Sequence, residues 1–272
     1  MGKTQMKIAV VQMSSGDDKA VNLEKAAALI RKAAAQGAEC VLLPESFLYR
    51  GQDACFPQIA EMIDGPSVKR CRGLAKDYGL YVLLGSIFEK VPGRKKVYNT
   101  AVMIGPKGRV LGAYRKQHLF EARASGTIIR EADFLMAGKT QKVFSVAGFR
   151  AGTAICYDLR FPDVFALYAA KGCHLFFVPS NFTDETGRAH WEVLLRARAI
   201  ENRCYVLAPN QHGIGALGVR AHGNSMIIDP WGNILKRAGA RGDEILVCSI
   251  DQKEIDRART RLPYNKTRRR CS

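Results

Sequence analysis

Cys156 is the side chain best suited to nucleophilic chemistry, because the residues around it predict a sharp turn between a strand and a helix. Small and apolar residues up to Ile155 suit a buried strand, and Pro162 suits the first position of a helix. A thiol at such a turn lies near the unpaired N–H groups and the dipole of the helix, which ease the formation of a thiolate. A buried structural cysteine is the alternative, since free cysteine usually packs as a small hydrophobic side chain. A catalytic role therefore needs a base and an oxyanion stabiliser from elsewhere in the chain.

Two charged side chains follow the ends of other predicted strands. Glu45 comes after the apolar run 40–43 and Pro44, and Lys116 comes directly after the predicted strand 110–115. In open α/β sheets, functional sites gather at the carboxyl ends of strands, so an acid and an amine at these positions are well placed for chemistry. Taken singly, each is more commonly an exposed loop carboxylate or a solvated lysine.

Helices and strands must position these groups. Apolar residues at helical spacing predict helices over 20–35, 68–78 and 188–202. The predicted strands are 7–13, 40–43, 80–88, 97–104, 110–115, 174–178, 204–208 and 224–229. Segment 121–138 has weak periodicity, contains Glu131 and is predicted to be a long functional loop. The fold class that this order indicates is α/β, with mixed sheets covered by helices.

Length and composition favour a single globular domain. A chain of 272 residues with 47% hydrophobic residues can bury a full core, and we expect one domain over residues 1–272 with a basic C-terminal tail from about residue 257. No segment approaches the roughly 18 consecutive apolar residues of a membrane span, and the first residues do not resemble a signal peptide. The eight cysteines are scattered singly, which argues against a zinc site or a disulfide scaffold and indicates a reducing compartment, most simply the cytosol.

Sequence motifs that would bind a cofactor or a metal ion are weak. Residues 213–218 match the glycine spacing of dinucleotide-binding turns, but no predicted helix follows them, and we interpret them as a loop. The five histidines are not spaced as a metal set, and His190 is either a residue that lines a site or a hydrogen-bonded structural histidine.

The formal net charge of +17 raises an alternative from another class of protein, a nucleic-acid-binding module. Basic residues cluster at 69–72, 94–96 and 266–270, but none of these clusters lies in a recognisable binding motif. Solvated faces and a basic tail explain them more simply.

Four segments, taken together and in order, resemble the carbon-nitrogen hydrolase, or nitrilase-like, superfamily. They are residues 43–47, 115–120, 129–134 and 154–162. The resemblance implies a four-layer α-β-β-α sandwich with mixed β-sheets. It also implies a catalytic triad of Glu45, Lys116 and Cys156 with Glu131 in support, and no metal or organic cofactor.

The chemistry of these residue types agrees with what the resemblance implies. Glu45 is expected to act as the general base, and Cys156 is expected to attack a carbonyl or nitrile carbon. Lys116 and the backbone N–H of Tyr157 are expected to stabilise the oxyanion. Arg160, His190 and Arg188 are candidates for the substrate pocket, although a structural ion pair is at least as common for either arginine.

Within the superfamily, residues 156–162 and 189–201 look most like those of the Nit-type amidases, which act on ω-amides of keto acids and on deaminated glutathione. The expected function is therefore hydrolysis of a small anionic amide through a thioester. A nitrilase and an N-carbamoyl amidase are alternatives within the superfamily, and a catalytically idle subunit is a more distant one. The resemblance also suggests a homodimer or a larger homo-oligomer.

Overall fold

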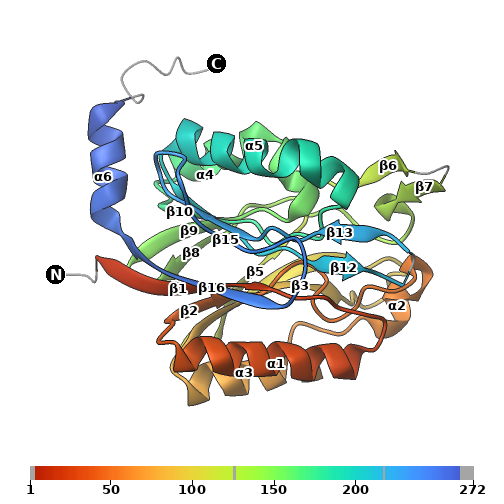
Figure 1. Ribbon diagram of the computed structural model, residues 1–272. Helices are drawn as coiled ribbons and strands as arrows, with labels where there is room; N and C mark the ends of the chain where they lie inside the picture. The colour runs from red at the N-terminus through yellow and green to blue at the C-terminus, as the bar shows by residue number, and fades with distance from the viewer. Residues whose placement is uncertain (1–3, 125–126, 217, 264–272) are drawn as a thin grey trace.

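The computed structural model describes residues 4–124, 127–216 and 218–263, and it has four layers (Figure 1). Two six-stranded sheets face each other in the middle. Helices α1 (Lys19–Ala35) and α3 (Pro66–Asp77) cover the outer face of one sheet. Helices α4 (Pro162–Ala170) and α5 (Asp184–Asn202) cover the outer face of the other. The expected α-β-β-α sandwich is confirmed.

The first sheet has the strand order β16-β1-β2-β3-β4-β5, in which β1, β2 and β3 are parallel and the other neighbours are antiparallel. Its strands are β1 (Gln5–Gln12), β2 (Cys40–Leu42), β3 (Tyr81–Glu89), β4 (Tyr98–Ile104), β5 (Val110–Arg115) and β16 (Glu244–Asp251). Strands β2 and β5 run in the same direction, because β4 reverses the chain between β3 and β5. Their carboxyl ends therefore lie at the same edge of the sheet.

The second sheet has the order β15-β14-β11-β10-β9-β8, with β9, β10 and β11 parallel. Its strands are β8 (Val143–Val146), β9 (Phe149–Thr153), β10 (Leu175–Phe177), β11 (Tyr205–Ala208), β14 (Met226–Ile228) and β15 (Ile234–Arg237). Helix α4 connects β9 to β10, and helix α5 connects β10 to β11. Such helical crossovers are the usual connection between parallel strands.

Two hydrophobic clusters hold the layers together, and successive residues of one strand face them in turn. Ile8 and Val10 of β1 pack in the cluster between the sheets, whereas Ala9 and Val11 pack against α1 and α3. Burying each large aliphatic side chain contributes about 1.5–3 kcal/mol. The strand ends that carry the polar groups are therefore fixed from both faces.

Two predictions about local structure need correction. Helix α5 begins at Asp184 rather than at residue 188, because Asp184 and Glu185 in its first turn complement the helix dipole. The predicted loop 121–138 instead contains the hairpin of β6 (Glu121–Ala124) and β7 (Thr127–Arg130), followed by a 3-10 turn over Glu131–Asp133. The weak apolar periodicity reflects the small size of this hairpin, which pairs outside the two large sheets.

The glycine-containing loop also belongs to a hairpin. Strands β12 (His212–Ile214) and β13 (Arg220–His222) pair with each other and flank it. The shorter elements of the chain are a 3-10 turn over Asp53–Cys55, helix α2 (Phe56–Ile59) and a 3-10 turn over Cys156–Arg160.

Helix α6 (Gln252–Arg261) ends the described chain, so residues from 257 onward are helical as far as Arg261. Its first turn is capped by the Asp251 carboxylate, which accepts a hydrogen bond from the backbone N–H of Lys253. The basic cluster at 266–270 lies outside the described residues.

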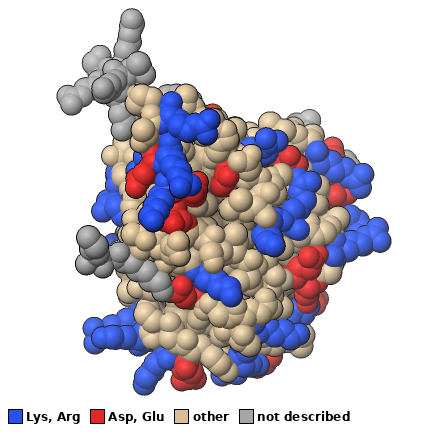
Figure 2. Space-filling model, turned by 60° about the vertical axis from the view of Figure 1, so that its left-hand side comes forward, with Lys and Arg blue, Asp and Glu red and all other residues tan. Residues whose placement is uncertain are grey.

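Lys and Arg side chains are dispersed over the face shown in Figure 2 and are interleaved with Asp and Glu. Within the described residues, no helix has both the length and the apolar character needed to cross a membrane.

Candidate active site

Glu45, Lys116 and Cys156 come together at one cavity of about 270 Å³, which Glu131 also lines. Glu45 follows β2 and Lys116 follows β5, at the shared edge of the first sheet. Cys156 follows β9 of the second sheet. The cavity therefore lies where strand ends of the two facing sheets meet. This agrees with the expectation that functional sites gather at the carboxyl ends of strands.

Lys116 lies at the centre of the polar cluster. Its side chain is 1% exposed, and its Nζ lies 2.9 Å from Glu45 Oε1 and 2.9 Å from Glu131 Oε1. Burial alone would lower the pKa of Lys116, but the charges of Glu131 and Glu45 raise this pKa well above its usual value. Lys116 is therefore an ammonium ion, and two carboxylates offset its charge.

Glu45 is held on both carboxylate oxygens. Its Oε1 also accepts a hydrogen bond of 2.9 Å from the Asn99 side chain, and its Oε2 accepts one of 2.8 Å from the backbone N–H of Asn181. A close approach of strands makes this possible, because a Cβ at Gly85 would lie 1.9 Å from the carbonyl oxygen of Leu43. Only glycine fits there, and the chain segment before Glu45 can then lie against β3.

Asn99 and Asn181 were not among the predicted site residues. Asn181 follows the buried strand β10 by a few residues, so its position after a strand end was a usable signal. Asn99 lies inside β4, and nothing in its sequence surroundings distinguishes it from other strand residues.

Glu131 connects the lysine to the chain after β5. While one of its oxygens contacts Lys116, Oε2 accepts a hydrogen bond of 2.7 Å from the backbone N–H of Phe120. Burial raises the pKa of Glu131, Lys116 lowers it, and the neighbouring Glu45 raises it. The carboxylate is thus fixed beside the lysine and close to a second acid.

Cys156 has a strained backbone with a φ of +46°. For a residue other than glycine this conformation costs roughly 1–2 kcal/mol and occurs often at functional sites. Its backbone N–H donates to the carbonyl oxygen of Pro179 at 3.0 Å, which anchors the turn to the end of β10. The strained conformation is therefore held by the adjacent parallel strand.

The expectation of an eased thiolate is wrong. Burial raises the pKa of the Cys156 thiol well above its ordinary value, Glu45 raises it further, and Lys116 lowers it. Helix α4 begins only at Pro162, beyond the 3-10 turn that contains Cys156, so its dipole acts from a distance. The thiol is protonated in the resting protein and needs a base.

Asp158 ties the cysteine turn to the segment after Lys116. It is fully buried, and its carboxylate accepts hydrogen bonds from the Ile155 backbone N–H at 2.9 Å and from the Tyr114 hydroxyl at 2.7 Å. Asp158 Oδ1 also accepts a hydrogen bond of 2.8 Å from the backbone N–H of His118, and it lies 2.8 Å from His118 Nδ1. Asp158 is thus a positioning residue that joins β5, the Lys116 segment and the turn.

The residues predicted for substrate binding lie in different places. Tyr157 and Arg160 line the cavity, and the Arg160 guanidinium lies 5.6 Å from the centre of the Tyr157 ring and 5.1 Å from that of Phe182. His190 contacts Arg160, with its Nδ1 3.1 Å from Nη1, and is not among the lining residues. Arg188 is 76% exposed, pairs with Asp184 at 2.9 Å and does not line the cavity.

Within the described ranges of the chain, no group of three or more His, Cys, Asp or Glu side chains is arranged to hold a metal ion. At the candidate site, the position between the two glutamates belongs to the Lys116 ammonium group.

Comparison with known proteins agrees with this geometry. The family model for carbon-nitrogen hydrolase matches residues 7–260. The omega-amidase NIT2 of Mus musculus is 38% identical over 264 residues, which are 97% of this chain and 95% of that protein.

Two solved structures share the fold. The C. elegans NitFhit protein aligns with a TM-score of 0.93 at 34% identity, over 99% of this chain and 66% of that chain. Saccharomyces cerevisiae Nit3, a member of branch 10 of the nitrilase superfamily, aligns with a TM-score of 0.90 at 32% identity, over 98% of each chain.

The chain belongs to the carbon-nitrogen hydrolase family, within the nitrilase superfamily. It is an enzyme that hydrolyses carbon-nitrogen bonds in small molecules. Of the two classes of protein considered from the sequence, family membership therefore supports the enzyme and not the nucleic-acid-binding module.

Proposed function

We propose that the enzyme is an amidase that hydrolyses the ω-amide of a small anionic acid through a thioester on Cys156. The observation that carries the proposal is the buried Glu45–Lys116–Glu131 cluster, which lines the same cavity as Cys156 and its strained backbone. The identity of 38% to an omega-amidase supports the choice of substrate class.

The first step is attack on the amide. Glu45 accepts the proton of the Cys156 thiol, and the sulfur forms a bond to the carbonyl carbon. Proton transfer as the sulfur attacks suits a thiol whose pKa burial has raised, because little free thiolate exists before substrate arrives. The hydrogen bonds from Asn99 and Asn181 keep the Glu45 carboxylate in place for this transfer.

The oxyanion that forms is stabilised by the Lys116 ammonium group and the backbone N–H of Tyr157. Such preorganised donors act strongly in a buried site, where removal of one typically costs about 10²–10³ in rate. Glu131 also contacts Lys116 at 2.9 Å and, together with Glu45, keeps it charged.

Collapse of the tetrahedral intermediate breaks the carbon-nitrogen bond. The nitrogen takes the proton from Glu45 and leaves as ammonia, and the acyl group stays on Cys156 as a thioester. Glu45 then removes a proton from a water molecule, which attacks the thioester and releases the acid and the thiol. Atoms and charges balance over the cycle without another reactant.

The position of Arg160 supports the proposal that the substrate is anionic. Its guanidinium lines the cavity, and it forms no ion pair with a carboxylate of the described chain; its polar contact is His190. A planar guanidinium can bind a substrate carboxylate through two parallel hydrogen bonds. His190 would then act through Arg160, as a positioning residue.

The proposal is tested by ammonia release from succinamate, glutaramate and 2-oxoglutaramate, combined with mass spectrometry of the intact protein. We expect ammonia release and an acyl adduct on Cys156 that Cys156→Ala abolishes. Hydrolysis that persists in Cys156→Ala would exclude the thioester. Turnover of nitriles or N-carbamoyl compounds instead would assign the enzyme to one of these alternatives, and no turnover at all would favour an idle subunit.

We also propose a cytoplasmic homo-oligomer. The seven cysteines of the described residues are all free, which suits a reducing compartment. The outer surface of α4 and α5 exposes apolar side chains, with Leu167 at 53%, Val193 at 66% and Ile200 at 40% exposure, and a second copy would cover them. Light scattering of the purified protein tests the assembly, and a monomeric mass would contradict it.

A further inference from the structure

The turn that carries Glu45 has a strained backbone, which buried side chains from other elements hold in place. Ser46 has a φ of +54°, a conformation that residues other than glycine rarely adopt. Its backbone N–H donates to Ser86 Oγ of β3 at 2.8 Å. The carbonyl oxygen of Glu45 accepts a hydrogen bond of 2.9 Å from Gln211 Nε2. Such a conformation persists only where its surroundings fix it, and here the surroundings come from distant parts of the chain.

Gln211 and Ser15 form a closed pair behind this turn. The backbone N–H of Ser15 donates to Gln211 Oε1 at 3.0 Å, and Gln211 Nε2 donates to Ser15 Oγ at 3.0 Å. Ser15 Oγ in turn donates to the carbonyl oxygen of Phe47 at 2.8 Å. Gln211 is fully buried, Ser15 is 2% exposed, and neither is among the residues that line the cavity. The pair therefore contacts the turn from behind and does not meet the substrate.

Gln211 connects the base to the sheet that carries the nucleophile. Glu45 follows β2 of the first sheet, whereas Gln211 follows β11 of the second. The backbone N–H of Gln211 donates to the carbonyl oxygen of Ser180 at 3.0 Å. Pro179, the residue before Ser180, accepts the backbone N–H of Cys156. A short path of hydrogen bonds thus leads from Cys156 through residues 179–180 and Gln211 to the backbone of Glu45.

We propose that Gln211, oriented by Ser15, is a positioning residue that sets the distance between Glu45 and Cys156. The inference rests on the proposed function, in which Glu45 takes the proton of the thiol. Other groups hold the Glu45 carboxylate, so Gln211 fixes the backbone from which that side chain extends. Proton transfer needs a heavy-atom distance of about 2.6–3.2 Å, and a displacement of about 1 Å can lower a rate by roughly 10²-fold.

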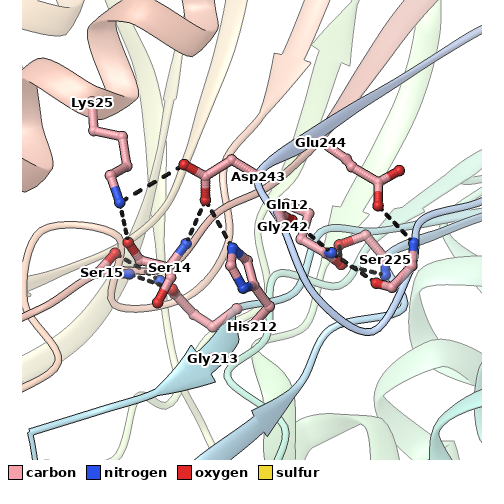
Figure 3. A network of polar contacts seen from close by, with 12 residues as sticks. Gln12, Ser14, Ser15, Lys25, His212, Gly213, Ser225, Gly242, Asp243 and Glu244 are labelled. Carbon is pink, nitrogen blue, oxygen red and sulfur yellow. Dashed lines mark hydrogen bonds and ion pairs between the residues drawn. The ribbon is translucent and has the colours of Figure 1, made fainter.

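The backbone around Gln211 has anchors other than its side chain (Figure 3). His212 Nε2 lies 2.8 Å from Asp243 Oδ1, which also accepts the backbone N–H of Ser14 at 3.0 Å. The backbone N–H of His212 donates to the carbonyl oxygen of Met13 at 3.2 Å. Gln211→Met, which removes the amide and keeps a side chain of similar length, therefore leaves the segment attached to the end of β1.

Gln12 offers a matched control, because it is also a fully buried glutamine whose amide joins separate segments (Figure 3). Its Oε1 accepts the backbone N–H of Ser225 at 3.0 Å. Its Nε2 donates to the carbonyl oxygens of Gly239 at 2.8 Å and Gly242 at 3.1 Å. These contacts join β1 to the start of β14 and to the loop before β16. Gln12→Met therefore removes the same group without touching the turn of the base.

The first test compares the two variants in thermal unfolding and in hydrolysis of glutaramate. Both should unfold at a lower temperature than the wild type. Only Gln211→Met should lower kcat, by on the order of 10- to 100-fold, with little change in KM because the residue does not line the cavity. An equal fall of kcat in both variants would reflect a general loss of structure and would overturn the proposal.

The second test asks whether Gln211 acts through Glu45. In a Glu45→Gln background, Gln211→Met should change kcat little further, because the group that it positions is already gone. The two substitutions should therefore be strongly non-additive. The same fold-loss in both backgrounds would show that Gln211 acts independently of the base, which contradicts the positioning role.

Alkylation of Cys156 by iodoacetamide, followed by mass spectrometry of its peptide, needs no turnover. The charge of Glu45 helps to raise the pKa of Cys156, so a displaced carboxylate should lower this pKa. Gln211→Met should then shift the alkylation profile to lower pH, and Gln12→Met should keep the wild-type profile. This shift without hydrolysis of any amide would support the positioning and reject only the amidase function. An unchanged profile overturns the positioning, whether or not glutaramate is hydrolysed.

Ser15→Ala is a milder variant that keeps the test decisive if Gln211→Met does not fold. It removes the hydroxyl that orients the Gln211 amide and that bonds to Phe47. We expect kcat to fall by about threefold, the value of one neutral hydrogen bond, and the alkylation profile to shift in the same direction. A Ser15→Ala enzyme with wild-type kcat and a wild-type profile would contradict the proposal.

Discussion

The floor and the rim of the cavity are built in opposite ways. In the floor, Lys116 lies between Glu45 and Glu131 at 2.9 Å from each, so that charges are neutralised by neighbours in the protein. In the rim, Arg50 and Arg160 bond to carbonyl groups or to a histidine and have no carboxylate partner in the described chain. The charges of the floor thus offset one another within the protein, whereas those of the rim are the ones that the proposed anionic substrate can neutralise.

The two regions also differ in what holds them. The floor residues follow strands whose two faces are packed between hydrophobic clusters. The rim is made of shorter pieces of chain: the loop after β2 that contains Arg50, the end of the Cys156–Arg160 turn, and the hairpins β6–β7 and β12–β13, which pair outside the large sheets. Changes in the floor should therefore affect the rate and the stability, and changes in the rim should affect which substrate is bound.

Replacement of the nucleophile should have the largest effect. We expect Cys156→Ser to lower kcat by on the order of 10⁴-fold or more, since a hydroxyl is far harder to activate than a thiol. Ammonia release measures the rate, and the acyl adduct should disappear from the mass spectrum. If Cys156→Ser kept a rate near that of the wild type, Cys156 would not be the nucleophile and the reaction would take place elsewhere.

Glu45→Gln should separate two roles of the carboxylate. Loss of the general base should lower kcat by about 10²–10⁴-fold. The pKa of Cys156 should fall at the same time, because the negative charge that helps to raise it is gone. Alkylation of Cys156 by iodoacetamide should therefore shift to lower pH while turnover falls. Identical alkylation profiles in the wild type and the variant would remove Glu45 from this role.

Lys116→Met should cost stability in addition to the rate lost with an oxyanion donor. It leaves two buried carboxylates without their cation, and breaking a buried ion pair in this way costs about 3–5 kcal/mol of unfolding free energy. Burial already raises the pKa of Glu131, and loss of Lys116 removes the charge that lowers it. The folded variant then binds a proton more tightly than the unfolded chain, so its stability should recover as the pH falls.

Urea unfolding of wild type and Lys116→Met at several pH values measures this difference. The double variant Lys116→Met with Glu131→Gln is the control, because it removes one of the unpaired charges and should regain part of the stability. A cost that does not change with pH would indicate loss of packing rather than of charge pairing.

Floor and rim were not equally predictable from the sequence. Glu45, Lys116 and Cys156 follow recognisable strand ends, and ordered local segments marked them together with Glu131. The raised pKa of the Cys156 thiol could not be predicted, because it depends on burial and on Glu45, a residue distant in the chain. In the rim, Arg160 was among the predicted residues and lines the cavity, whereas Arg50 and Gly215 were missed. Arg50 and Gly215 are far apart in sequence, and only the folded chain places one over the other.

Arg160→Gln should have a smaller effect, on substrate binding rather than on chemistry. Loss of the charge-assisted contact should raise KM for glutaramate on the order of tenfold and change kcat little. Steady-state kinetics with glutaramate and with its neutral analogue butyramide measure the effect. Butyramide hydrolysis should be affected much less. An equal loss for both amides would mean that Arg160 shapes the floor through Tyr157 instead of binding the carboxylate.

The smallest effect is expected at Asp53, an acid that lines the cavity in which we propose that an anionic substrate binds. Burial raises the pKa of Asp53, and the charge of Lys116 lowers it. Above this pKa its carboxylate repels an anionic substrate, and below it the repulsion is gone. KM for glutaramate should therefore fall as the pH decreases through the pKa of Asp53, and Asp53→Asn should lower KM at neutral pH by about two- to threefold, in line with a screened charge. The variant should also lose this part of the pH dependence. A KM that rises in Asp53→Asn would show that the carboxylate binds the substrate, and the rim would then recognise a positive group as well as a negative one.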